Sequence, residues 1–143
     1  NRSREGWGHI WRRIYAVSGT VSIENSTFFE NEAIVSGGAI YRYGEKTTIE
    51  SSTFIRNQAG SHGGAVLVNK VGSLSIENSE FFENEAIKKG GAISLWHGAT
   101  HGIRRSAFKA NGSNQTTGGA VAVYNSQLVL SETDLIENEA LRG

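Results

Sequence analysis

Two short motifs recur along this chain with one shared period, and that period limits the possible folds more than any other feature. The first motif is Phe-x-x-Asn, whose starts are 26, 27, 27 and 27 residues apart, with leucine replacing phenylalanine in the last copy. Its residues are Phe28, Asn31, Phe54, Asn57, Phe81, Asn84, Phe108, Asn111, Leu135 and Asn138. The second motif is Gly-Gly-Ala followed by Ile or Val. Its glycines are Gly37, Gly38, Gly63, Gly64, Gly90, Gly91, Gly118 and Gly119. The chain is therefore a repeat protein.

Composition narrows the class further. The 143 residues suit one domain, and the formal net charge of zero gives no indication of a nucleic-acid or anionic-membrane partner. No apolar run approaches the roughly 20 residues of a membrane helix, so we expect no direct membrane insertion by this segment. The chain has no cysteine, which excludes disulfides and thiolate metal sites. It also has no proline, as suits a chain that is nearly all sheet.

Apolar residues alternate at strand spacing in three short segments of each repeat. The first segment contributes a column of β-branched residues, and the third contributes the Phe column. The first column consists of Ile14, Ile40, Val66, Ile93 and Val121. The second segment contributes pairs such as Leu74 and Ile76. Three strands per repeat predict an all-β fold: a right-handed, single-stranded parallel β-helix of about five coils of roughly 27 residues. Residues 14–143 would form the coils and residues 1–13 an N-terminal cap.

Each motif has a physical role on such a scaffold. The glycine pair allows a positive φ or a close backbone approach where the chain turns into the first strand. The Phe rings would stack from coil to coil inside the core. The Asn of the first motif falls at a corner, where its amide can bond the equivalent amide above and below. The alternative is that this Asn simply takes a left-handed turn conformation.

The paired motifs, Gly-Gly-Ala-(Ile/Val) and Phe-x-x-Asn, resemble the repeats of the polymorphic outer-membrane proteins. These proteins are bacterial autotransporters with a secreted β-helical passenger, and their repeats are associated with adhesion to host cells. The resemblance extends from about Ile14 to Asn138. It implies a β-helix at the cell surface or outside the cell.

The two ends depart from the repeat. Trp11-Arg12-Arg13-Ile14 stands where later coils have Gly-Gly-Ala-Ile. We expect a strand from Ile14 to Val17, with Trp7 and Trp11 covering the first coil, because solenoid ends expose unpaired strand edges. The chain starts at Asn1 and stops at Gly143, one residue before the next Gly-Gly-Ala would begin. This indicates a processed or excised piece whose coils continue further, or stack on another subunit.

Residues for catalysis or metal binding are sparse. Parallel β-helix enzymes that cleave acidic polysaccharides use clustered aspartates, whereas this chain has a single aspartate, Asp134. Glutamates form columns instead, and a calcium site there is the minor alternative to a solvated face. One glutamate column consists of Glu24, Glu50 and Glu77, and the other consists of Glu32, Gln58 and Glu85. A third column, of Glu30, Arg56 and Glu83, alternates in charge, which indicates an exposed ion-pair ladder. The four histidines come from different coil positions, which argues against zinc. We expect no enzyme activity, no metal and no cofactor.

Outward-facing aromatic residues are the better candidates for binding. If Ile40 points inward, its neighbours Tyr41 and Tyr43 point outward, and Tyr15, Trp96 and Tyr124 occupy equivalent positions. Exposed aromatic strips bind glycans or proteins through large, stiff surfaces. The alternative is cross-strand stacking beneath a loop. Arg42 falls in an otherwise apolar column, which a local bulge or a stem that reaches solvent could explain.

Four Asn-x-(Ser/Thr) tripeptides are present, and two of them are plausible glycosylation acceptors in a eukaryotic source. These two begin at Asn25 and Asn114, whereas Asn111 is a corner residue of its coil.

Three functions are consistent with these patterns. The leading hypothesis is a non-catalytic surface or secreted passenger that adheres to a host-cell or matrix protein or glycan. The alternative is a structural subunit whose end coils join head to tail into an extracellular filament. A polysaccharide-acting enzyme is a distant third.

Overall fold

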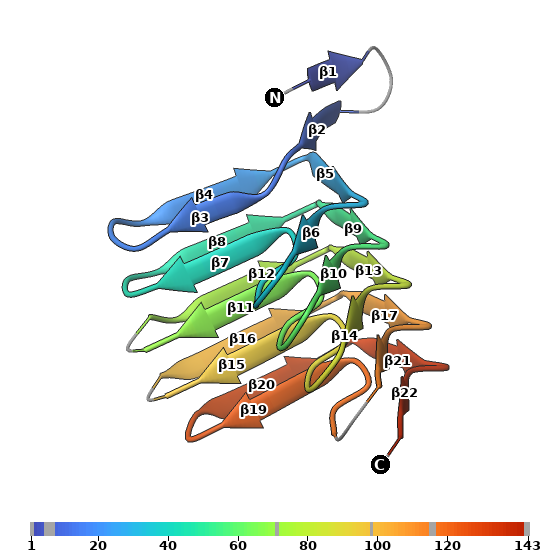
Figure 1. Ribbon diagram of the computed structural model, residues 1–143. Helices are drawn as coiled ribbons and strands as arrows, with labels where there is room; N and C mark the ends of the chain where they lie inside the picture. Colours follow the sequence, from blue (N-terminus) through green and yellow to red (C-terminus); the bar gives the residue numbers. More distant parts are fainter. Residues whose placement is uncertain (1, 5–7, 71, 98, 115–116, 142–143) are drawn as a thin grey trace.

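The computed structural model describes residues 2–4, 8–70, 72–97, 99–114 and 117–141, with only the backbone for residues 2–4 and 8–11. Every described element is a β-strand, and the strands stack into four sheets that run along one solenoid (Figure 1). Because no described element is helical, none could cross a membrane as a helix. In Figure 1 the chain runs along β3 in front, returns along β4 behind and then steps down to β7, which makes each coil right-handed.

Each sheet contains one strand from every coil, and neighbouring coils pair in parallel. The β3–β19 sheet consists of β3 (Ile14–Ala16), β7 (Ile40–Tyr43), β11 (Val66–Asn69), β15 (Ile93–Trp96) and β19 (Val121–Tyr124). The β4–β20 sheet consists of β4 (Val21–Glu24), β8 (Thr47–Glu50), β12 (Leu74–Glu77), β16 (Thr100–Arg104) and β20 (Gln127–Ser131).

The other two sheets complete the coil. The β1–β21 sheet consists of β1 (Arg2–Arg4), β2 (Gly8–Trp11), β5 (Ser26–Phe29), β9 (Thr53–Ile55), β13 (Glu80–Phe82), β17 (Ala107–Lys109) and β21 (Asp134–Ile136). The β6–β22 sheet consists of β6 (Glu32–Ala33), β10 (Gln58–Ala59), β14 (Glu85–Ala86), β18 (Gly112–Ser113) and β22 (Glu139–Ala140). A full coil thus has four strands. The fourth, of only two residues, was not predicted, because it is too short to show alternation.

The N-terminal backbone departs from the parallel pattern. β1 pairs antiparallel with β2, and β2 pairs in parallel with β5, with Trp11 opposite Phe28. β3 begins at Ile14 opposite Ile40, as the repeat register predicted. Trp7 and the side chain of Trp11 lie outside the described residues, so their covering role stays a prediction.

The predicted Phe column is a single internal stack. Neighbouring ring centroids are 4.7, 4.6 and 4.6 Å apart, and the rings are within 4° of parallel. The four stacked rings are those of Phe28, Phe54, Phe81 and Phe108, and all are fully buried. Beside them, the Ile/Val column of the β3–β19 sheet and the Leu/Ile pairs of the β4–β20 sheet fill the rest of the core. Dispersion and apolar burial therefore favour one register between coils.

The corner Asn residues form the predicted ladder. The side-chain amide of each donates to the side-chain oxygen of the next, as from Asn57 to Asn84 (2.9 Å) and from Asn84 to Asn111 (3.0 Å). The alternative of a left-handed Asn is wrong, because the left-handed residue is the one before it, as in Glu83 with φ of 53°. The Asn side chain instead satisfies backbone groups that the corner leaves unpaired.

The glycine pair has the two roles predicted for it. Gly63 has a φ of 64°, and the first glycine of each other pair is similarly left-handed. The second glycine, Gly64, allows close approach, since an added Cβ would meet the carbonyl oxygens of Gly91 and Glu85.

A second ladder was missed at the sequence level. Two residues before the Phe or Leu of the first motif lies a serine or threonine, and from Ser52 onward its hydroxyl accepts the N–H of its counterpart in the preceding coil. The hydroxyl also donates to the carbonyl two residues earlier in its own coil, as from Ser52 to Glu50 (2.8 Å). The residues are Ser26, Ser52, Ser79, Ser106 and Thr133. This column satisfies the backbone at the corner between the β4–β20 and β1–β21 sheets.

Arg42 fits the apolar column in neither of the two ways expected. Its strand pairs without a bulge on both sides, and the residue is fully buried, so the guanidinium does not reach solvent. Its Nε donates to Thr47 Oγ1 (2.8 Å), and its terminal nitrogens donate to the carbonyls of Ala16, Ser18 and Gly19 in the preceding turn. Burial lowers the Arg42 pKa, partly offset by Glu45, and these bonds satisfy the buried charge.

Candidate functional site

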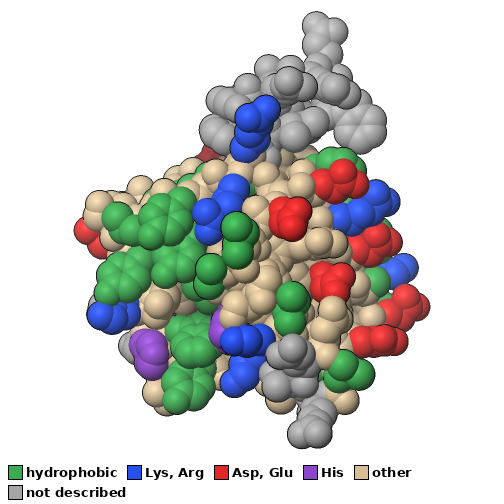
Figure 2. Space-filling model, viewed as in Figure 1, with side chains coloured by type: hydrophobic (Ala, Val, Ile, Leu, Met, Phe, Trp, Pro, Cys, Tyr) green, Lys and Arg blue, Asp and Glu red, His purple; other side chains and the backbone are tan. Residues whose placement is uncertain are grey.

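The outer face of the β3–β19 sheet brings together all five aromatic residues singled out from the sequence. The strand register sorts them into two columns. The first column runs Tyr15, Tyr41, Leu67, Ser94 and Ala122. The second runs Tyr43, Asn69, Trp96 and Tyr124. Figure 2 shows hydrophobic side chains gathered on this side of the molecule, with Lys and His among them, whereas most visible carboxylates lie at the opposite edge.

The N-terminal part of the face holds an exposed tyrosine pair. The rings of Tyr15 and Tyr41 stack at 4.9 Å between centroids, and Tyr15 is 62% exposed. The guanidinium of Arg13 lies 5.6 Å from the centre of the Tyr15 ring, and its Nε donates to Gly37 O (2.9 Å). With Ile34 and Val35 they line a hollow of about 530 Å³. Cross-strand stacking, the alternative to an exposed binding strip, thus occurs at Tyr15 and Tyr41 together with exposure of the Tyr15 ring.

The C-terminal part of the face holds a second aromatic cluster around Trp96. Its indole N–H donates to Ser94 Oγ (2.7 Å), which fixes the ring. The Tyr124 ring lies 5.1 Å from the indole at 42°, and His62 contacts the indole edge-on at 4.8 Å. His97 contacts Tyr124 edge-on at 5.5 Å. These contacts restrict the orientation of the indole.

Two lysine ammonium groups lie beside rings of the second aromatic column. The ammonium of Lys70 lies 5.2 Å from the Tyr43 ring centre, and that of Lys89 lies 6.0 Å from the Tyr124 ring centre. Burial, together with Lys88 and Lys89, lowers the pKa of His62. His62 is therefore harder to protonate than a free imidazole, and the permanent positive charge beside Trp96 is carried by lysine.

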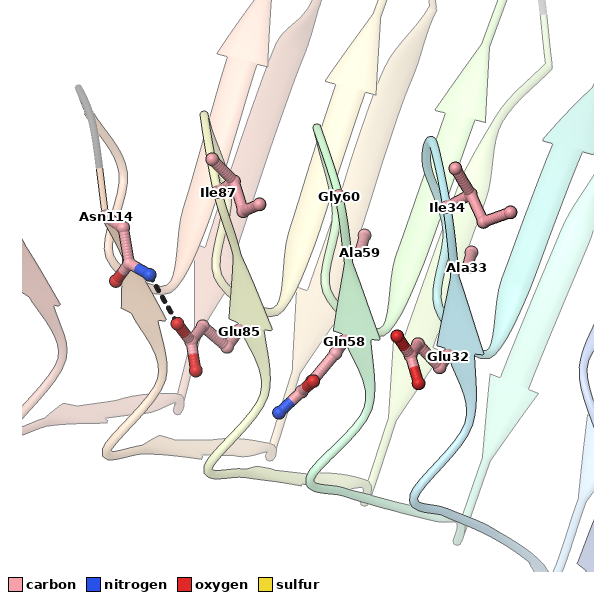
Figure 3. A pocket seen from close by; sticks show the side chains of 9 residues that line it. All are labelled: Glu32, Ala33, Ile34, Gln58, Ala59, Gly60, Glu85, Ile87 and Asn114. Atoms are coloured by element: carbon pink, nitrogen blue, oxygen red, sulfur yellow. Dashed lines mark hydrogen bonds between the residues drawn. The ribbon is translucent and has the colours of Figure 1, made fainter.

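A second groove lies over the β6–β22 sheet and contains the predicted column Glu32, Gln58 and Glu85. Figure 3 shows these side chains in one row, with Ile34 and Ile87 flanking them along the groove of about 380 Å³. Asn114 donates to Glu85 there. The carboxylates of Glu32 and Glu85 are separated by a neutral amide residue. This geometry is that of a polar exposed face, the interpretation preferred from the sequence.

The column of alternating charge is an ion-pair ladder. Arg56 contacts Glu30 at 3.3 Å and Glu83 at 3.0 Å, all on the surface, as the alternating charges indicated. Such exposed pairs contribute little to stability. Among the described residues no group of three or more His, Cys, Asp or Glu side chains could hold a metal ion.

His101 is the unusual histidine. It is 1% exposed in the inward column between Leu74 and Leu128, and its Nδ1 accepts the Leu74 N–H (3.0 Å). Because Nδ1 accepts, the neutral ring carries its proton on Nε2, which has no hydrogen-bond partner in the structure. Burial lowers the His101 pKa. It belongs to the core and not to the aromatic face.

The two predicted glycosylation acceptors are exposed, as modification would require. Asn25 lies at a left-handed corner with φ of 46°, and Asn114 lies at the rim of the β6–β22 groove. The two residues that complete the Asn114 tripeptide lie outside the described part. Asn111 is buried in the ladder and is closed to modification. Glycosylation at Asn25 and Asn114 stays a prediction.

Fold and surface together define a right-handed parallel β-solenoid with an aromatic, cation-bearing outer face. Two stretches of the chain, residues 25–41 and 78–95, match the model of the Chlamydia polymorphic membrane protein (Chlamydia_PMP) repeat. Each match contains one Phe-x-x-Asn and the Gly-Gly-Ala that follows it, the motifs on which the resemblance was based. The match suggests a surface-exposed β-helix of the autotransporter kind. No curated protein and no solved structure matches the chain.

Proposed function

We propose that this chain is a non-catalytic, surface-exposed passenger segment that adheres through the outer face of its β3–β19 sheet. The aromatic face carries the proposal. Tyr15 stacks on Tyr41 and is still 62% exposed, and Tyr124 packs at a tilt against Trp96 and is still 48% exposed, so both pairs present ring surface to solvent. The matching repeat family supports a location at the outer membrane or beyond it. The ligand is a host-cell or matrix protein or glycan.

The test is binding of the purified chain to arrays of matrix proteins and glycans and to cultured animal cells. A double variant, Tyr41→Ala with Trp96→Ala, removes one ring from each cluster. The matched control is Phe29→Ala, which removes an exposed ring from β5 on another sheet. We expect binding by the parent chain, retained by the control and reduced at least tenfold by the double variant. Equal binding by all three proteins would refute the role of this face.

A second proposal is end-to-end association, favoured by the last coil. Residues that face inward are uncovered there, including Leu135 at 52% exposure in the Phe column and Leu130 at 41% in the β4–β20 sheet. A following coil, from this chain or from a second copy, would bury them. Sedimentation velocity at rising concentration tests this. Species that lengthen with concentration are expected, and a single monomeric species at about 100 μM would argue against it.

A further inference from the structure

The C-terminal aromatic cluster borders a hollow on the outer face of the β3–β19 sheet. In the first outer column the side chains are large over the N-terminal coils and small over the last two, where Ser94 and Ala122 follow Leu67. The change leaves a hollow of about 260 Å³ over β15 and β19. Ser94, which is fully buried, and Ala122 both line the hollow.

The two walls of the hollow differ in chemistry. One wall is aromatic and consists of Trp96 and Tyr124, whose rings lie at 42° to one another. The other is polar and consists of Lys89 and Thr117, which pair through an isolated β-bridge just before the glycine turn. Lys89 is half-buried, and its ammonium lies on the Tyr124 side of the hollow, 6.0 Å from the ring centre.

Charge selects the sign of the ligand. The residues that line the hollow include a lysine and no carboxylate, and Lys88 lies beside it in the sequence. Burial and these lysines lower the pKa of the nearby His62, so the positive charge at the hollow comes from lysine. The hydrogen bonds of an ammonium with a carboxylate or sulfate are charge-assisted and about twice as strong as bonds between neutral groups.

We propose that this hollow binds one ring of an anionic glycan, a sugar that carries a carboxylate or a sulfate. The sugar ring lies against the Trp96 indole, its anionic group faces Lys89, and its hydroxyls meet Thr117. A hollow of about 260 Å³ is smaller than the roughly 300–1,000 Å³ of sites for drug-sized ligands, and suits one ring of a longer chain that continues along the face. The inference rests on the proposed adhesive function and names the ligand class for it.

Three oligosaccharide probes separate the two possible anionic groups. Heparin-derived hexasaccharide carries sulfate and carboxylate, hyaluronan hexasaccharide carries carboxylate only, and maltohexaose carries neither. Titration calorimetry with the purified chain measures each. Binding of at least one anionic probe is expected, with none to maltohexaose. Binding to heparin fragments alone assigns sulfate, and binding to both assigns the carboxylate.

Point variants locate the site. Lys89→Gln and Trp96→Ala are each expected to weaken binding of the anionic probe about tenfold. Lys109→Gln, which removes an exposed lysine on the β1–β21 sheet, is the matched charge control and should change the affinity less than twofold. Urea midpoints for all variants show that the fold is retained, and Lys89→Gln keeps the test valid if Trp96→Ala is unstable.

Two outcomes overturn the inference. One is the absence of saturable binding of either anionic probe up to about 1 mM. The other is an equal loss with Lys89→Gln and Lys109→Gln, which would mean diffuse charge attraction. If the chain still adheres to cells or matrix proteins in either case, the proposed function stands and only the ligand class fails. If it adheres to nothing, the proposed function itself fails.

Discussion

Removing one rung of the Asn ladder should cost far more in the middle of the solenoid than at its end. Asn84 is fully buried, and its side chain makes four hydrogen bonds. Its oxygen accepts from the backbone N–H (2.9 Å) and side-chain amide (2.9 Å) of Asn57. Its amide donates to Phe54 O (2.9 Å) and Asn111 Oδ1 (3.0 Å). Asn84→Ala removes all four and leaves buried groups of both adjacent coils without these partners.

The magnitude follows from that inventory. A buried hydrogen bond contributes about 0.5–1.5 kcal/mol net, so four give about 2–6 kcal/mol, and the unpaired partners push the loss toward the upper part of that range. Asn138 makes three equivalent bonds, but it is half-buried in the last coil, where water can replace it. Asn138→Ala should therefore cost only about 1–2 kcal/mol.

Urea unfolding followed by circular dichroism measures both losses as free energies of unfolding, provided that the slope with urea is unchanged. Asn114→Ala is the control, because it removes an exposed amide outside the ladder; its effect should stay within about 0.5 kcal/mol. The reasoning would be refuted if Asn84→Ala cost no more than Asn138→Ala. In that case the ladder would accompany the fold without stabilising it.

Three further predictions concern the core. Phe81→Ala, in the middle of the ring stack, should lower the free energy of unfolding by about 3–5 kcal/mol in the same urea assay; a loss under 1 kcal/mol would contradict tight stacking. Gly64→Ala should destabilise the chain by more than about 3 kcal/mol, because the new Cβ would meet backbone oxygen atoms. Gly102→Ala, which has open space around it, is the control and should change the free energy of unfolding by less than about 1 kcal/mol. Similar effects of the two substitutions would contradict the close approach at Gly64. For His101, the lowered folded-state pKa means that the unfolded chain binds protons first. The free energy of unfolding is then at its full value above pH 6.5, and it falls by up to about 1.4 kcal/mol for each pH unit below 6.5. In urea titrations at pH 7.5, 6.5 and 5.5, His101→Leu should reduce this pH dependence. An unchanged pH dependence would contradict the assignment to His101.

The interior of the solenoid was predictable because stacking imposes the same requirement on every coil. A ring at Phe54 needs a ring above and below it, and a corner amide at Asn57 needs another amide, so both leave a period in the sequence. The serine ladder leaves the same period and could have been found two residues before each Phe. It was missed because serine is common on exposed strands, and its partner here is backbone, which no sequence pattern displays.

The features that were not predicted depend on contacts between different parts of the coil. The acceptors of Arg42 are carbonyls of a turn in the preceding coil, and a column pattern contains no information on where turn carbonyls point. The aromatic columns followed from alternation, yet their division into two clusters depends on Asn69 and Leu67 in the middle coil. The hollow is lined by a lysine from one column, an indole from another and small residues from a third, and no single column pattern predicts that combination.

This division between inside and outside explains how such a chain can carry specific function. Inward positions are coupled from coil to coil, since an internal ring or amide contacts its counterparts above and below, and a change there weakens both adjacent coils. Outward positions on the β3–β19 sheet contact mainly their neighbours, so Tyr41 in one coil can be followed by Ser94 two coils later without altering the register. A repeated core therefore leaves the outer columns free to differ from coil to coil. The aromatic clusters occur where that freedom has been used, and this is why function should be sought in the departures from the repeat.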